Sequence, residues 1–118
     1  MKEEFVTYDQ ALALKELGFD EDCLMYIDDE EDLINDDTAE WIGAVKAPLK
    51  QQVFRWFREK HDLWFRPDYY NEMREYDYQG SIYQLGRYSS LASLDNYKTV
   101  EELESACIDK LIEIVKNK

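Results

Sequence analysis

The stretch APLKQQVFRWFREKH, residues 47–61, decides the fold, because it joins a helix start to a broad apolar stripe. Pro48 suits the first helical position, where its missing N–H costs no hydrogen bond. At 3.6 residues per turn, apolar and polar side chains separate onto two faces. The expected inner face holds Leu49, Val53, Trp56, Phe57 and Lys60, with Phe54 at its edge, and the outer face holds Gln51, Arg55, Arg58 and Glu59. We therefore expect a helix from Pro48 to His61 that lies across a sheet.

A shorter helix is expected near the start of the chain. Thr7 and Gln10 have the spacing of a capping box, which predicts a helix from Tyr8 to Leu17. Gly18 follows at the position where helices commonly end with a positive φ. The sequence therefore places both ends of this helix.

Three extended segments are expected between the two helices. Residues 23–27 are apolar without alternation, which is typical of a strand buried on both faces. Leu33 and Ile34 suit the return strand of a hairpin whose tip is acidic. Residues 41–45 suit another extended piece.

The second half of the chain predicts more strands and a final helix. Residues 63–66 suit a short strand that ends at Pro67, because proline cannot donate to a sheet. Residues 71–85 suit a hairpin that turns at Gln79-Gly80, and residues 86–96 an irregular loop. Thr99 and Glu102 have capping-box spacing before an apolar stripe, which predicts a helix to about Lys116.

These elements together predict an α+β fold. We expect a single domain over residues 1–118, with an antiparallel sheet of about four or five short strands packed by two or three helices. The longest unbroken apolar run covers five residues, 23–27, far below the roughly 20 that a membrane helix needs. Cys23 and Cys107 lie far apart without metal-site or CxxC spacing, so we expect reduced, buried thiols in a cytoplasmic protein.

The net charge of −13 is concentrated in the first part of the chain. Residues 1–45 hold two lysines and 15 acidic residues, so the whole excess lies there. Such a block is usually a solvated loop, but charge asymmetry also marks interaction surfaces. We expect an acidic loop at about 28–40. The candidate interaction surface consists of Asp28, Asp29, Glu30, Glu31, Asp32, Asp36 and Asp37, with Arg55 and Arg58 as the nearest opposing positive charge.

The motifs of common chemistry are missing from the sequence. A calcium loop starting at Asp28 would need glycine at its sixth position and glutamate at its twelfth, where Leu33 and Ala39 stand. His61 is the only histidine, so one chain cannot supply a site with several histidines, and we expect the protonated imidazole to complement the dipole at a helix end. The sequence predicts no enzyme activity, no cofactor and no metal.

Three kinds of binding are open. The preferred hypothesis is a small accessory protein whose acidic surface engages a basic protein partner. An acidic mimic of DNA, which would inhibit a DNA-binding enzyme, is an alternative. Another is single-stranded nucleic-acid binding through residues 46–74, where basic residues such as Arg55 and Arg58 alternate with aromatic ones such as Trp64. The net negative charge disfavours nucleic acid, because approach to a polyanion is repulsive.

Three blocks of the sequence carry a resemblance: residues 5–20, residues 47–60 and residues 97–113. They resemble a group of small proteins of no assigned activity from gut Bacteroidales and their phages or prophages. Residues 28–40 and 86–96 are not covered by it. The resemblance implies a cytoplasmic, phage-related protein with an accessory or host-interaction role, and it implies no functional residue.

Overall fold

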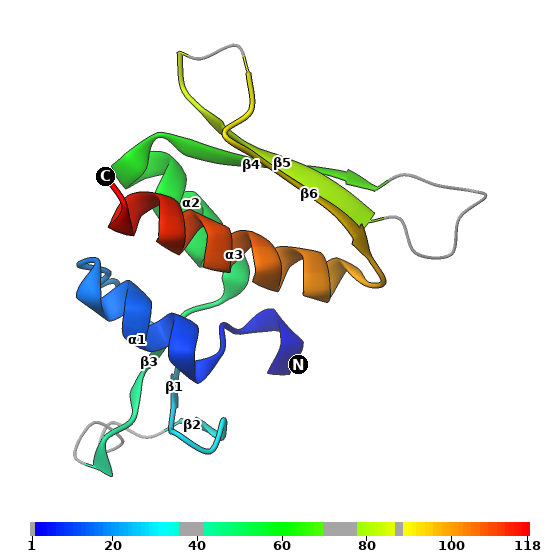
Figure 1. Cartoon of the computed structure of the whole chain (residues 1–118). Helices are drawn as coiled ribbons and strands as arrows, with labels where there is room; N and C mark the ends of the chain where they lie inside the picture. The colour runs from blue at the N-terminus through cyan, green and yellow to red at the C-terminus, as the bar shows by residue number, and fades with distance from the viewer. Residues whose placement is uncertain (1, 36–41, 70–77, 87–88) are drawn as a thin grey trace. The chain divides into compact units, whose positions relative to one another are not determined.

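The computed structural model describes residues 2–35, 42–69, 78–86 and 89–118. The chain divides into two compact units, Met1–Val53 and Phe54–Lys118. The expectation of a single domain stays a prediction. Figure 1 labels all the elements except η1. In chain order they are η1 (Lys2–Glu4), α1 (Tyr8–Glu16), β1 (Met25–Ile27), β2 (Leu33–Ile34), β3 (Val45–Ala47), α2 (Lys50–His61), β4 (Leu63–Tyr69), β5 (Tyr78–Gln84), β6 (Ala92–Tyr97) and α3 (Val100–Lys116).

Both ends of α1 confirm the sequence prediction. The Thr7 hydroxyl accepts from the N–H of Gln10, and the Gln10 side chain accepts from the N–H of Thr7, which completes the capping box. At the other end Gly18 takes a φ of 97°. The Phe19 N–H donates to the carbonyl of Leu14, so that the buried Phe19 folds back over the last turn.

The first unit contains a three-stranded antiparallel sheet in the order β2-β1-β3. The predicted hairpin is confirmed, because Tyr26 lies opposite Ile34 and residues 28–32 form the tip between the strands. The expectation that residues 23–27 are buried on both faces is wrong. The strand begins only at Met25, and Leu24 is 76% exposed. The last extended piece lies slightly later than predicted, at Val45–Ala47, and Trp41 lies outside the described residues.

Helix α2 starts two residues later than the sequence predicts. Pro48 and Leu49 are extended, because they pair with the N-terminal segment: the Val6 N–H donates to the Pro48 carbonyl, and Phe5 bridges Leu49. Pro48 therefore lies before the helix rather than at its first position. The predicted faces hold from Val53 onward, where four apolar side chains are buried, although Lys60 is exposed. The buried set is Val53, Phe54, Trp56 and Phe57.

The second unit contains a sheet in the order β4-β5-β6, with longer strands. Two sequence predictions fail here. β4 continues past Pro67 to Tyr69, which an edge strand tolerates. Gly80 lies inside β5 opposite Pro67 instead of at a hairpin turn. A Cβ at Gly80 would stand 2.6 Å from the Phe65 ring, so this glycine permits close packing.

The loop predicted at 86–96 is also wrong in its second half. Residues 92–97 form β6, which pairs with β5 through a register shift between Tyr78 and Gly80. Most of the predicted hairpin's first arm, 71–77, and residues 87–88 lie outside the described residues.

Helix α3 is the last element of the second unit and lies along β5 and β6 (Figure 1). The Thr99 hydroxyl accepts from the N–H of Glu102, as predicted, whereas the Glu102 carboxylate accepts from Lys98 rather than from Thr99. The buried face of α3 contains Leu103, Cys107, Ile108, Leu111 and Ile112.

The α+β class is confirmed. The described strands divide between two three-stranded sheets, where the sequence predicts one. Helix α2 separates the strands of the first sheet from those of the second along the chain, and Asp62, with a φ of 56°, leads directly from this helix into β4. Strand patterns give no information on which strands pair across such a separation.

Candidate functional site

The acidic hairpin tip between β1 and β2 is an ordered turn. The Asp28 carboxylate accepts from the N–H of Glu30 at 3.0 Å and of Asp32 at 2.9 Å. Backbone bonds add to this, since the Asp28 N–H donates to Asp32 and the Glu31 N–H donates to Asp28. Side-chain bonds of this kind let aspartate replace a backbone turn. Asp28 thus shapes the tip.

Glu31 fastens the same tip to helix α1. Both oxygens of its carboxylate accept from the N–H of Tyr8, each at 3.1 Å. Tyr8 is the first residue of the helix, where N–H groups lack partners and the dipole favours negative charge. Glu31 adopts a φ of 65°, a conformation that costs a non-glycine residue about 1–2 kcal/mol. The contact with Tyr8 offsets part of that strain.

The remaining carboxylates of the tip face solvent. Asp29, Glu30 and Asp32 are exposed, whereas Asp28 and Glu31 are half-buried. Asp36 and Asp37 lie outside the described residues. The structure therefore divides the described carboxylates of the predicted surface into two that build the turn and three that it presents to solvent.

The two arginines of the predicted surface belong to the second unit and make contacts on their own helix and strand. Arg55 lies 3.5 Å from Glu59, one helical turn away, and both side chains are more than half exposed. Such exposed pairs contribute little to stability. The Arg58 guanidinium lies over the Trp64 ring, 5.5 Å from its centre. Their role as opposing charge for the tip stays a prediction.

Trp64 is the most exposed aromatic residue among those the structure describes, at 47%. It lies on the edge strand β4, opposite Tyr83. Trp56, by contrast, is buried at 4%, and its ring packs against Phe57 at 5.0 Å between ring centres. The predicted basic and aromatic segment thus contains both core and surface aromatics.

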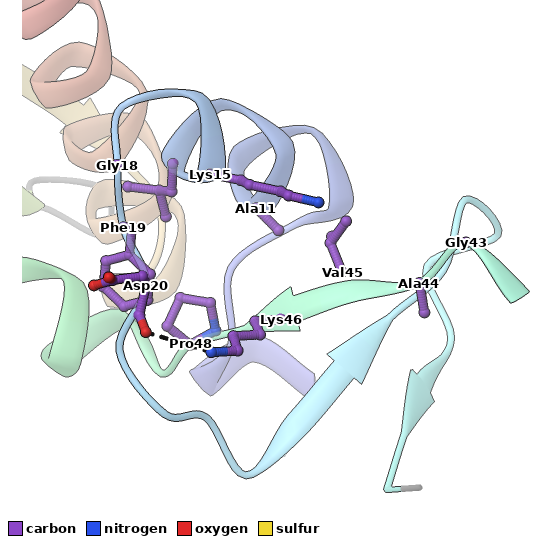
Figure 2. Close-up of a pocket in the computed structure, with 11 residues that line it drawn as sticks. Ala11, Lys15, Gly18, Phe19, Asp20, Gly43, Ala44, Val45, Lys46 and Pro48 are labelled. Carbon is purple, nitrogen blue, oxygen red and sulfur yellow. Dashed lines mark hydrogen bonds between the residues drawn. The ribbon is translucent and has the colours of Figure 1, made fainter. Parts of the chain in front are cut away.

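The first unit also holds a cavity of about 600 Å³ that the sequence analysis misses (Figure 2). Its walls come from the end of α1, the turn that follows and the approach to β3. Lys15 and Lys46 stand on the helical and strand walls. The lining consists of Ala11, Leu14, Lys15, Gly18, Phe19, Asp20, Gly43, Ala44, Val45, Lys46 and Pro48. No local motif joins these residues, which is why periodicity could not find them.

His61 differs from its predicted role at the helix end. Its ring lies against two aromatic neighbours, with centres 5.0 Å from Trp56 and 5.9 Å from Phe57. Burial, together with the nearby Lys118 charge, lowers the pKa of His61. The structure thus favours the neutral imidazole over the cation that the sequence analysis expects.

The two cysteines are free thiols in different surroundings. Cys107 is buried, as predicted, and burial raises its pKa far above the ordinary value. Cys23 is only half-buried, and partial burial raises its pKa to about 11. Neither thiol is therefore activated as a nucleophile at neutral pH.

Within the described ranges, no group of three or more histidine, cysteine or acidic side chains is arranged to hold a metal ion. Of the helices described, none has the length and apolar character to cross a membrane. Comparisons with protein-family models, curated proteins and solved structures find no match, so the family resemblance of the sequence stays a prediction.

Proposed function

We propose that this chain is a small non-enzymatic binding protein whose acidic hairpin tip engages a basic protein partner. The observation that supports this is that the carboxylates of the tip have two different roles. Asp28 and Glu31 hold the turn by internal hydrogen bonds, and Asp29, Glu30 and Asp32 remain exposed. An ordered turn loses less conformational entropy on binding than a disordered acidic loop would. A cytoplasmic, phage-related accessory role belongs to the same proposal.

Charge neutralisation with a matched control tests this proposal. The tip variant carries Asp29→Asn, Glu30→Gln and Asp32→Asn. The control carries Asp95→Asn, Asp109→Asn and Glu113→Gln, three exposed carboxylates of the second unit. Tagged proteins are used to capture partners from the source cells at about 0.05 M and 0.5 M salt, where screening differs strongly.

The expected result is a basic protein retained at low salt by the parent chain and the control, and lost with the tip variant. Capture that is equal for all three chains contradicts the proposal. An acidic mimic of DNA uses the same carboxylates, so duplex DNA is added as a competitor. Release of a DNA-binding enzyme by that competitor favours the mimic over an ordinary basic partner.

A second candidate is single-stranded nucleic-acid binding, which the exposed Trp64 beside Arg58 supports. Bases stack on exposed aromatic rings, and arginine adds attraction for phosphate. A gel shift with labelled single strands at low salt tests it, comparing the parent chain with Trp64→Leu. A shift that disappears in the variant favours this candidate, and the absence of any shift removes it.

A further inference from the structure

The cavity of the first unit has the form of a small-molecule site. Its volume of about 600 Å³ lies within the roughly 300–1,000 Å³ usual for such sites. The apolar part of its lining includes the buried side chains of Leu14, Phe19 and Val45. Gly18 and Gly43 also line it, and a Cβ at either position would meet no atom within 4 Å. The cavity therefore offers apolar contact with open space beside two glycines.

The charge around the cavity is opposite to that of its unit. The first unit holds four lysines and 15 acidic residues, and two of those lysines, Lys15 and Lys46, line the cavity. Asp20 is the single carboxylate in the lining. A locally cationic cavity in an acidic unit indicates an anionic ligand.

Within the described residues, the hydrogen bond of Lys46 is with a neutral group. The Lys46 ammonium donates to the backbone carbonyl of Asp20 at 3.3 Å (Figure 2), a neutral acceptor that does not cancel the charge. An ammonium group has three donors, so further bonds are open to it. Lys15 is exposed on the opposite wall. The two lysines therefore stand on opposite walls of the cavity, with their ammonium groups turned in different directions (Figure 2).

We propose that this cavity binds a small monocarboxylate with an apolar body, whose carboxylate pairs with one lysine of the lining, Lys15 or Lys46. The apolar walls recognise the body by removing it from water. A single negative charge suits two lysines beside one aspartate, whereas a doubly charged phosphate would meet more of the unit's negative field. This inference is independent of the partner proposed for the hairpin tip, since it uses other residues.

Three ten-carbon probes separate charge from apolar contact: decanoate, decanol and decylamine, each below its micelle concentration. Binding to the intact chain is followed by amide NMR shifts, with Gly18 and Gly43 as reporters inside the cavity. We expect decanoate to bind about tenfold tighter than decanol, and decylamine to bind no more tightly than decanol. Equal binding of decanoate and decanol, or no binding of decanoate, overturns the proposal.

Two variants locate the carboxylate. Lys15→Met and Lys46→Met keep an apolar stem and remove the charge, and the one that removes the partner of the carboxylate should weaken decanoate about three- to tenfold without changing decanol. Lys116→Met, an exposed lysine at the end of α3, is the matched control and should leave both unchanged. Decanoate binding that is the same in all three variants overturns the proposal, and unchanged amide spectra of the free variants show that each is folded.

Discussion

The two units of this chain differ in the length of their strands and in the contacts around them. The strands of the first unit have two or three residues each, and side-chain hydrogen bonds hold the segments around them. These bonds join Glu31 to Tyr8, Asp28 to its own turn, and Gln52 to Glu21. The second unit has strands of six or seven residues and a helix with five buried residues. Both units bury apolar side chains, and the difference is that the first unit combines this burial with polar contacts that fix short segments.

The largest effect is expected where apolar burial is complete. Leu103 on α3 has no exposed surface, so Leu103→Ala leaves a cavity and should lower the free energy of unfolding by about 2–5 kcal/mol. Leu85 in the same unit is 68% exposed, and Leu85→Ala should change it by less than about 0.5 kcal/mol. Urea denaturation of the two variants measures the difference, and equal losses would contradict the burial pattern.

The substitution Gly80→Ala tests how closely β5 packs against Phe65 in the second sheet. In Gly80→Ala the new Cβ would stand 2.6 Å from the Phe65 ring and 3.1 Å from the Arg66 carbonyl, so something must move. We expect a loss of about 1–3 kcal/mol in urea denaturation. Ser81→Ala, at the next position of β5, is the control. Adding Phe65→Leu to Gly80→Ala should recover part of the loss, and no recovery would mean that the ring is not the obstacle.

Glu31 tests the polar fastening of the first unit. Glu31→Gln keeps the side-chain length and removes the charge that faces the start of α1, so we expect a loss of about 0.5–1 kcal/mol. Hydrogen exchange should show it as weaker protection of the Tyr8 amide. Glu30→Gln neutralises the exposed neighbour and should leave that amide unchanged. The same loss from both substitutions would point to general charge effects rather than to the contact.

The smallest effect concerns pH. The pKa of His61 is lowered in the folded state, chiefly by burial, so the unfolded chain takes up the proton more readily. The contribution of neutral His61 to the free energy of unfolding is complete above the unfolded pKa of about 6.5. It is lost as the pH falls below that value toward the folded pKa. Urea midpoints should therefore fall slightly between about pH 7.5 and pH 5.5. This fall should flatten in His61→Gln, and an unchanged slope would assign it to other groups.

Local signals in the sequence predict the ends of helices well. Thr7, Gly18 and Thr99 each act within one helical turn, so their residue types alone indicate the caps that the structure contains. The start of α2 is a near miss for the opposite reason. Pro48 accepts a hydrogen bond from Val6 and the next residue, Leu49, bridges Phe5, so the segment before the helix pairs with residues that lie far away in the sequence.

The errors and omissions all depend on distant partners. Gly80 resembles a turn residue until the Phe65 ring is placed against it. Glu31 is one of several neighbouring carboxylates, and only the fold brings it to the N–H of Tyr8. Lys15 and Lys46 carry no shared motif and line the same cavity only because the fold packs α1 against β3. Periodicity and capping rules contain no information on such pairs.

The contact between Tyr8 and Glu31 also has a kinetic consequence. It joins residues 23 positions apart, so it can form only after that length of chain has closed into a loop. The capping box of Thr7 and Gln10 spans three positions and can form as soon as the helix does. Helix α1 can therefore begin from its local cap alone. Its first turn gains the second acceptor only after the hairpin of β1 and β2 closes, which makes the completion of the helix dependent on the hairpin during folding.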